Sequence, residues 1–500
     1  MRRKLPIFYS ALMLTGVNLL LRFVSTSFQV YLSGRIGAAG IGLLQLVLSV
    51  GALSMTAGMA GIRTTSMYLT AEELGRRHPG TVIWVLSACL LYSIVCSGVI
   101  ATTLYLLAPF LAQNWIGDPQ AVSAIRLYAY FVPVFCLCGV MSGYFTAANR
   151  IGTLAAVEVA EQLFSMVITM LCLIFWAGSD PHKACQSVIL GSGLSVCITL
   201  SCLIVLRIRE RVASVPRIPI RHRLFQTAVP LALADDLKAG ISTTENLMVP
   251  KRLSKYPGTD APLAAFGMVC GMVFPILMFP AAILFGLAEL LIPELARCAA
   301  AGSKQRIRYL VGQSLRVSIL YGCLFCGLEF LLAEELCLTL YQSMEAGKYL
   351  RLYALLIPML YCDAITDAMT KGLGQQKACV RYNILTSSMD VLFLFILLPR
   401  YGMMGYYFSF LVTHFLNFIL SLRRLLKIAG NVLQPSIPLL TILSATGSIW
   451  ICSHIYLPGL RSLGFVACFA SMLTLFGVIS RKDITWLCGL LTTKKTPSIP

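Results

Sequence analysis

Polar side chains recur along one face of two otherwise apolar segments. The first stripe, in segment 7–32, consists of Thr15, Asn18, Arg22, Ser25 and Gln29. The second stripe, in segment 225–249, consists of Asp235, Lys238, Ser242 and Glu245. Residues three or four positions apart share one face of a helix. Each stripe must therefore face protein or water, and the pair predicts a shared polar cavity.

The charged members of these stripes are the candidate functional groups, because ionisable residues within apolar helices are costly and mark pathways. Arg22 and Lys238 can contact an anionic phosphate group inside such a cavity, with Asn18 and Gln29 as polar neighbours. Glu245 and Asp235 can restrain those cations or bind a coupling cation. An alternative is that Arg22 is structural and pairs with a carboxylate such as Glu245.

Secondary candidates lie in segments 153–176 and 380–398. Glu158 and Glu161 fall near one end of the first segment, where a solvated position is cheap. Asp390 lies deeper in the second segment, so we expect it to be buried and to belong to the charge-coupling groups.

The composition places these segments in a membrane. The 500 residues are 58% hydrophobic and only 12% charged, with a mean hydropathy of +0.80, whereas about a quarter of the residues in a soluble chain are charged. We predict an all-α polytopic membrane protein with about fourteen transmembrane helices of about 20 residues each. The predicted helices lie near 7–32, 40–62, 82–108, 126–147, 153–176, 185–206, 225–249, 263–292, 309–333, 350–370, 380–398, 402–422, 436–457 and 461–480.

The net charge of +19 does not indicate nucleic acid as a partner, because the basic residues form short clusters between apolar runs. Such clusters are typical of cytoplasmic loops. With the N-terminus inside, most of the Lys and Arg residues fall on the inner side. The sequence thus predicts a multi-pass membrane protein with both termini in the cytoplasm.

A sequence repeat predicts two halves. Arg126-Leu-Tyr-Ala recurs as Arg351-Leu-Tyr-Ala at an offset of 225, and Pro133 matches Pro358 at the same offset. We predict two six-helix lobes around a central cavity, at 1–206 and 225–422. A basic cytoplasmic linker at 207–224 joins them, and an additional helix pair follows at 436–480. Repeats of this kind are a transporter architecture, with the binding site at the repeat interface.

Several chemistries are not indicated. Most of the 18 Cys lie inside apolar runs and the five His are scattered, so neither disulfides nor a metal site are expected. No Walker A sequence occurs, and we expect no cofactor and no enzymatic activity. Gly37, Gly40 and Gly42 resemble part of a phosphate loop, but their context in a membrane hairpin favours helix packing.

Motifs spread along the chain resemble the stage V sporulation protein B and polysaccharide-exporter group. They are LLLRF at 19–23, SGRIGAAGIGLLQ at 33–45, GIR at 61–63, TENLMVPKRL at 244–253 and FPAAILFGLAELLIP at 279–293. The resemblance implies the multidrug/oligosaccharidyl-lipid/polysaccharide exporter superfamily, with alternating access between two lobes. It also implies that Arg22, and more weakly Arg63, occupy positions of substrate-contacting arginines in lipid II flippases. Where those relatives have further arginines in the first helix, this chain has Phe28 and Gln29.

The leading hypothesis is a flippase for a polyprenyl-pyrophosphate-linked sugar used in cell-wall, spore-cortex or surface-polysaccharide synthesis. Its expected partners are this lipid-linked saccharide, membrane lipids and a coupling cation. Two alternatives stay open. One is a cation-coupled drug or metabolite antiporter of the same superfamily, and the other is a membrane-embedded glycosyltransferase, for which the outer segments are short.

Overall fold

The computed structural model describes residues 7–75, 80–148, 150–178, 180–209, 220–258, 261–430, 432 and 436–479. The chain divides into two compact units. Unit 1 comprises Met1–Phe279 and Asn383–Thr413, and unit 2 comprises Pro280–Tyr382 and His414–Pro500.

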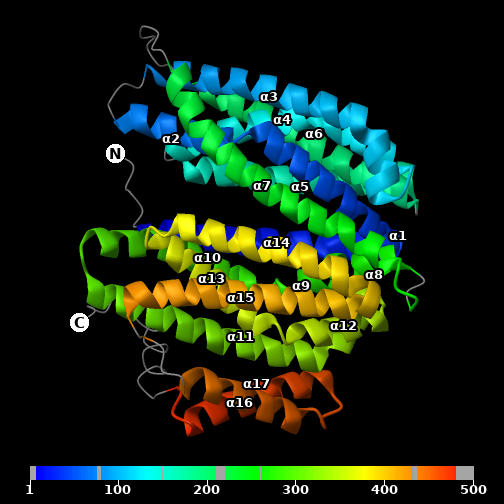
Figure 1. The fold of residues 1–500 in the computed structure, drawn as a ribbon, viewed down its shortest axis with the longest axis vertical. Helices are drawn as coiled ribbons and strands as arrows, with labels where there is room; N and C mark the ends of the chain where they lie inside the picture. The colour runs from blue at the N-terminus through cyan, green and yellow to red at the C-terminus, as the bar shows by residue number, and fades with distance from the viewer. Residues whose placement is uncertain are drawn as a thin grey trace. The chain divides into compact units, whose positions relative to one another are not determined.

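Unit 1 contains the N-terminal helices, among which α3, α4 and α6 lie side by side (Figure 1). Its elements are α1 (Ile7–Met59), α2 (Ile62–Gly75), α3 (Val82–Phe110), η1 (Leu111–Ile116), α4 (Ala121–Ala147), α5 (Ile151–Cys172), η2 (Leu173–Ala177), α6 (Pro181–Ile208), α7 (Arg221–Leu253), α8 (Pro262–Met268), η3 (Val269–Val273) and α9 (Phe274–Leu277). The three η elements are short π-helical turns that continue or join α-helices.

Unit 2 is built around the long helix α11, along which the pair α16 and α17 packs (Figure 1). Its elements are α10 (Ala281–Ala300), α11 (Lys304–Tyr341), α12 (Met344–Ala354), α13 (Ile357–Gly372), α16 (Ser436–Cys452) and α17 (Pro458–Leu475). Two further helices, α14 (Gln376–Tyr401) and α15 (Met403–Ala429), contribute residues to both units.

Close helix packing in unit 1 depends on glycine. Helix α1 is kinked at Gly37, whose φ of 68° favours glycine. Beyond the kink, α1 packs on α8 so closely that a Cβ at Gly267 would lie 2.0 Å from the carbonyl oxygen of Ala38. A Cβ at Gly42 would lie 2.3 Å from the carbonyl oxygen of Leu263. The helix-packing interpretation therefore holds for Gly42, whereas Gly37 forms the kink and a Cβ at Gly40 would meet Ile36 of the same helix.

The all-α membrane class is also confirmed. Nine of the described helices are long and apolar enough to cross a membrane, or up to eleven if each bent pair counts as one span. The first candidate, Leu19–Leu74, has 56 residues. At about 1.5 Å per residue it is more than twice the thickness of a bilayer's hydrocarbon core, so with its break at Gly37 it comprises more than one span.

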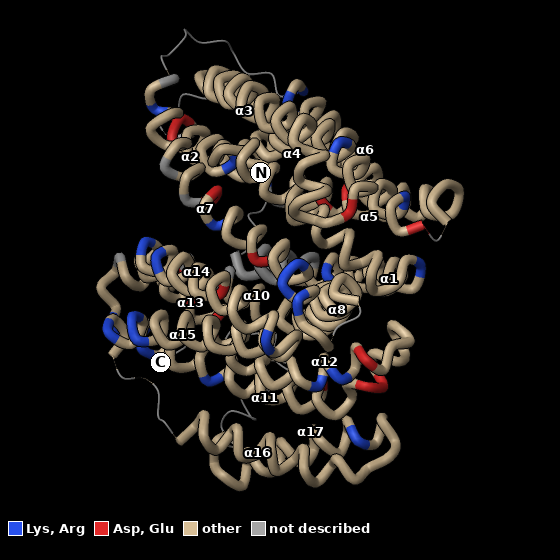
Figure 2. The backbone as a smooth tube through the Cα atoms, turned by 45° about the vertical axis from the view of Figure 1, so that its right-hand side comes forward, with Lys and Arg blue, Asp and Glu red and all other residues tan. Residues whose placement is uncertain are grey.

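Charge follows the helix ends. Figure 2 shows Lys and Arg concentrated toward the ends of helices, with few along their middles. In unit 2, α15 carries Arg423, Arg424 and Lys427 near its C-terminal end. The middle of helix α7 also holds charges, at Asp235, Lys238 and Glu245. Helix α7 is not among the described helices apolar enough to count as spans.

The fourteen predicted segments coincide largely with described helices. Two segments depart from single helices. The segment predicted at 263–292 consists of α8, η3, α9 and the start of α10, and the segment predicted at 350–370 consists of α12 and α13, bent by 56° at Leu355 and Leu356. Pro358 lies in the first turn of α13, where its missing N–H removes no hydrogen bond within the helix. Pro133, the matching residue, lies inside the unbroken helix α4.

The predicted lobes at 1–206 and 225–422 stay a prediction, as do the linker at 207–224 and the pair at 436–480 as separate parts. The boundaries of the two compact units differ from those of the predicted lobes, because α7 and α8 pack against α1 and therefore belong to unit 1. Of the predicted linker, residues 210–219 lie outside the described residues.

Candidate functional site

Helix α7 is held against α1 by two hydrogen bonds. The hydroxyl of Thr243 donates to the carbonyl oxygen of Ser49 at 3.1 Å, and the amide of Asn246 donates to the Ser49 hydroxyl at 3.0 Å. Thr243 and Asn246 each follow a stripe residue by one position, so these contacts hold the face of α7 that adjoins the stripe. Asp235, Lys238 and Ser242 are exposed in unit 1.

Glu245 is the half-buried member of the α7 stripe, and it interacts electrostatically with Asp390 on α14. Asp390 in turn accepts hydrogen bonds from two hydroxyls on α15. Ser409 donates to its Oδ1 at 2.5 Å and Thr413 donates to the same oxygen at 3.2 Å. Three helices thus bring two carboxylates and two hydroxyls together within unit 1. We call Glu245, Asp390, Ser409 and Thr413 the acidic cluster.

Oxygen atoms of this kind are the ligands that hard cations prefer in proteins. Among the described residues, no group of three or more His, Cys, Asp or Glu could hold a metal ion. The acidic cluster therefore matches a weakly held alkali cation or a proton better than a tightly bound transition metal.

On the α1 stripe, Arg22 is half-buried and forms no ion pair or hydrogen bond within the part of the chain that the structure describes. The structural alternative, in which Arg22 pairs with Glu245, is thus not the arrangement in this structure. Gln29 has a structural contact, because its amide donates to the carbonyl oxygen of Gly271 in η3 at 3.2 Å. The side chain of Asn18 lies outside the described residues.

The remaining predicted cations differ in their surroundings. Lys238 is exposed, and the described residues offer it neither an ion pair nor a hydrogen bond. Arg63 is exposed on α2 and interacts electrostatically with Glu158 on α5. Asp235 is exposed, and its negative charge interacts electrostatically with the neighbouring Asp236. The structure does not bring these residues into direct contact with Glu245 or Asp390.

Sequence reasoning missed the polar residues of α15. Ser409, Thr413 and Asn417 lie four residues apart in an apolar helix, which is the same signal that identified the stripes of α1 and α7. In unit 2, the amide of Asn417 bonds both oxygens of the buried Asp363, and Nδ1 of His414 lies 3.7 Å from Asp363 Oδ2.

A second missed group connects the start of α7 to the end of α2. Arg223 bonds Glu72, and it donates to Glu73 Oε1 at 2.9 Å. The hydroxyl of Thr81 donates to Glu73 Oε2 at 2.8 Å, so the buried Glu73 is bonded on both oxygens. Hydrogen bonding to Glu73 raises the pKa of Arg223 above its ordinary value. Arg223 is therefore a structural cation and not simply part of a basic linker.

Comparisons with known proteins bear on the family and the fold. Residues 247–396 match the family model MatE. Stage V sporulation protein B of Bacillus subtilis (strain 168) is 22% identical over 425 residues, which cover 79% of this chain and 78% of that protein. These matches confirm the resemblance to the stage V sporulation protein B and polysaccharide-exporter group.

Solved structures show the same fold. The lipid II flippase MurJ in an inward closed conformation has a TM-score of 0.73 at 10% identity, covering 95% of this chain and all of that one (100%). An inward-facing multidrug resistance MATE family transporter of the MOP superfamily has a TM-score of 0.63 at 13% identity, covering 85% and 98%. These two matches show the fold of the chain.

Proposed function

We propose that this chain is a flippase that moves a polyprenyl-pyrophosphate-linked sugar across a bacterial cytoplasmic membrane. The product would serve cell-wall, spore-cortex or surface-polysaccharide synthesis. The observation that carries the proposal is Arg22, a half-buried cation in an apolar helix that no described carboxylate neutralises. A buried charge without a partner is costly, and the pyrophosphate of a lipid carrier would supply the opposite charge during transport.

The other predicted substrate contacts have graded roles. Lys238 is a second cation without a described partner, and it would bind phosphate as a point charge, whereas the guanidinium of Arg22 can bind two oxygens at once. Gln29 would position η3 through Gly271. Asn18 would lie one turn from Arg22 on the same face of α1, and Arg63 would contribute to the positive potential.

A coupling cation would bind at the acidic cluster. Asp390 presents a carboxylate already oriented by Ser409 and Thr413, and the nearby Glu245 adds a second negative charge. Occupation by sodium or by a proton would relieve the repulsion between the two carboxylates. Asp235, which is exposed, would act as an outlying charge that attracts the cation.

The acidic cluster also supports the alternative function, a cation-coupled antiporter. Asp390 lies within the MatE match, and the fold is shared with a multidrug transporter. In that case Arg22 would be structural and would need a carboxylate partner. The absence of such a partner among the described residues favours the flippase.

Native mass spectrometry of the purified protein distinguishes the flippase from the antiporter. Undecaprenyl-pyrophosphate disaccharide would be added to the wild type, to Arg22→Ala and to Arg35→Ala. Arg35 is the matched control, because it is an exposed cation of the same helix stacked on Tyr31 at 5.6 Å. We expect binding by the wild type and the control, and about tenfold weaker binding by Arg22→Ala, since a charged hydrogen bond is worth about 1.5–3 kcal/mol.

Absence of binding by the wild type at excess lipid would overturn the flippase and favour the antiporter. Equal binding by Arg22→Ala would keep a lipid-linked substrate but remove Arg22 from the site. A transport readout accompanies the binding one, in which a fluorescent lipid-linked sugar is followed across proteoliposome membranes.

A further inference from the structure

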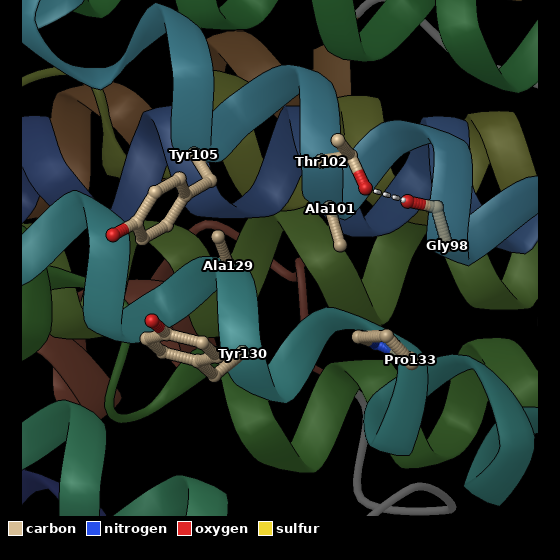
Figure 3. Close-up of a pocket in the computed structure, with 7 residues that line it drawn as sticks. All are labelled: Gly98, Ala101, Thr102, Tyr105, Ala129, Tyr130 and Pro133. Atoms are coloured by element: carbon tan, nitrogen blue, oxygen red, sulfur yellow. Dashed lines mark hydrogen bonds between the residues drawn. The ribbon is translucent and has the colours of Figure 1, made fainter.

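A groove of about 360 Å³ lies between α3 and α4 in unit 1, and none of the predicted site residues lines it. Figure 3 shows Tyr105 and Tyr130 at one end of the groove, with Gly98 and Pro133 at the other. The tyrosine end is polar, and the remainder is apolar apart from Thr102, whose hydroxyl donates to the carbonyl oxygen of Gly98 at 2.8 Å. Tyr130 is 66% exposed, so the groove opens on the outer surface of the helices.

A cation stands at the tyrosine end. The guanidinium carbon of Arg126, on α4, lies 4.9 Å from the centre of the Tyr105 ring. Its Nε is buried and has no hydrogen-bond partner among the described residues, as is also the case for Nε of Arg351. No carboxylate of the described chain forms an ion pair with Arg126.

The matching arginine in the second half of the sequence is neutralised. Arg351 lies 225 residues after Arg126, and it is stacked on Phe330, which lies 225 residues after Tyr105, at 5.7 Å. Arg351 also forms an ion pair with Glu334 at 3.1 Å. The residue 225 positions before Glu334 is Pro109, which carries no charge. The same arginine–aromatic arrangement therefore has its internal anion in unit 2 and lacks one in unit 1.

The two corresponding helix faces, on α3 at Thr102 and on α11 at Gly327, also differ in what packs on them. Thr102 lines the groove and is exposed. Gly327, 225 residues later, is covered by α17, and a Cβ at Gly327 would lie 2.0 Å from Cζ of Phe465. Unit 2 thus fills this face with an apolar ring, whereas the described part of unit 1 places no helix over Thr102.

We propose that the α3–α4 groove binds one anionic phospholipid. Its phosphate would accept hydrogen bonds from Arg126 and from the hydroxyls of Tyr105 and Tyr130, and an acyl chain would occupy the apolar part toward Gly98. The charge of Arg126 selects a lipid with net negative charge, because the phosphate of a zwitterionic lipid is already balanced by its own ammonium group. Arginine and tyrosine together suit the boundary between headgroups and acyl chains.

The test is a lipid titration of the detergent-purified full chain by native mass spectrometry. Phosphatidylglycerol and phosphatidylcholine with identical acyl chains are compared on the wild type, Arg126→Gln and Arg351→Gln. We expect the wild type to prefer phosphatidylglycerol and Arg126→Gln to bind it about tenfold more weakly. Arg351→Gln is the matched control and should bind phosphatidylglycerol like the wild type, because Arg351 already forms an ion pair with Glu334.

A second variant tests the acyl chain without changing charge. A Cβ at Gly98 would meet nothing within 4 Å, and Gly98 lines the groove. Gly98→Leu should therefore occupy the groove and weaken phosphatidylglycerol binding while Arg126 stays in place. Competition with inorganic phosphate distinguishes the source of the anion. Phosphate should not displace the lipid at equal concentration, because it makes none of the apolar contacts.

Three results would overturn the proposal: undiminished lipid binding by both Arg126→Gln and Gly98→Leu, equal binding of the two lipids by the wild type, or full displacement by inorganic phosphate. The melting temperature of each variant is measured alongside, and Gly98→Leu keeps the test valid if Arg126→Gln does not fold.

Discussion

The amide of Asn417 on α15 donates to both carboxylate oxygens of Asp363 on α13, at 3.1 and 3.2 Å. Asp363 is 9% exposed, so its carboxylate depends on protein donors for solvation. His414, one turn earlier on α15, approaches the same carboxylate. This contact joins two helices of unit 2 through polar groups inside an apolar environment.

Replacement of Asn417 by Leu should therefore destabilise the protein. The change leaves a buried carboxylate without its main donor, at a cost of about 1–3 kcal/mol or more for a charged group. The midpoint of thermal unfolding in detergent should fall. The double variant Asn417→Leu, Asp363→Leu should recover much of the loss, because both polar partners are then removed. A double variant less stable than either single variant would contradict this account.

The Arg223–Glu73 pair gives a second prediction, because Glu73 is 2% exposed whereas the Arg223 side chain is 30% exposed. Arg223→Ala should cost more than the about 0–1 kcal/mol of an exposed ion pair and less than the about 3–5 kcal/mol of a fully buried one. Arg306→Ala is the control, since Arg306 pairs with Glu294 from a side chain that is 61% exposed. Equal effects of the two substitutions on thermal unfolding would show that burial of Glu73 is unimportant.

Asp390→Asn should uncouple transport from the cation while leaving the helix contacts in place. Asparagine keeps an oxygen that can accept from Ser409, but it removes the negative charge, and we expect about tenfold weaker cation binding. Flipping of a fluorescent lipid-linked sugar is measured in proteoliposomes with sodium, potassium and proton gradients. Glu345→Gln, at the exposed start of α12, is the control. An unchanged ion dependence of Asp390→Asn would remove the acidic cluster from coupling.

Two glycine-to-alanine substitutions should have opposite effects. Gly267→Ala places a Cβ against the backbone of α1, 2.0 Å from the Ala38 carbonyl oxygen, and overpacking of this kind costs about 1–3 kcal/mol or more. Gly98→Ala places a Cβ in open space and should raise stability by about 0.5–1 kcal/mol, because alanine is the better helix former. Thermal unfolding of the two variants beside the wild type measures both effects.

Sequence reasoning can use patterns that lie within a single helix, such as the spacing of polar residues along one face. The stripes of α1 and α7 follow from spacing, which marks Glu245 as a candidate, whereas the depth of Asp390 in segment 380–398 marks that residue. The same spacing on α15 also marks Ser409, Thr413 and Asn417, so these residues were available to sequence reasoning. What spacing does not contain is the partner of each stripe, because the neighbouring helix comes from a distant part of the chain.

The sequence by itself determined that this chain is an all-α membrane protein with helices in these places, because hydropathy and helical period are local properties. It also marked the ionisable residues within apolar helices, which are costly in a membrane and therefore indicate functional sites. The tertiary structure decided which of them meet. It joined Asp390 to Ser409 and Thr413, left Arg22 without a described carboxylate, and gave Arg351 an anion that Arg126 lacks. These outcomes depend on which helix faces pack together, and packing brings together residues that lie far apart in the chain.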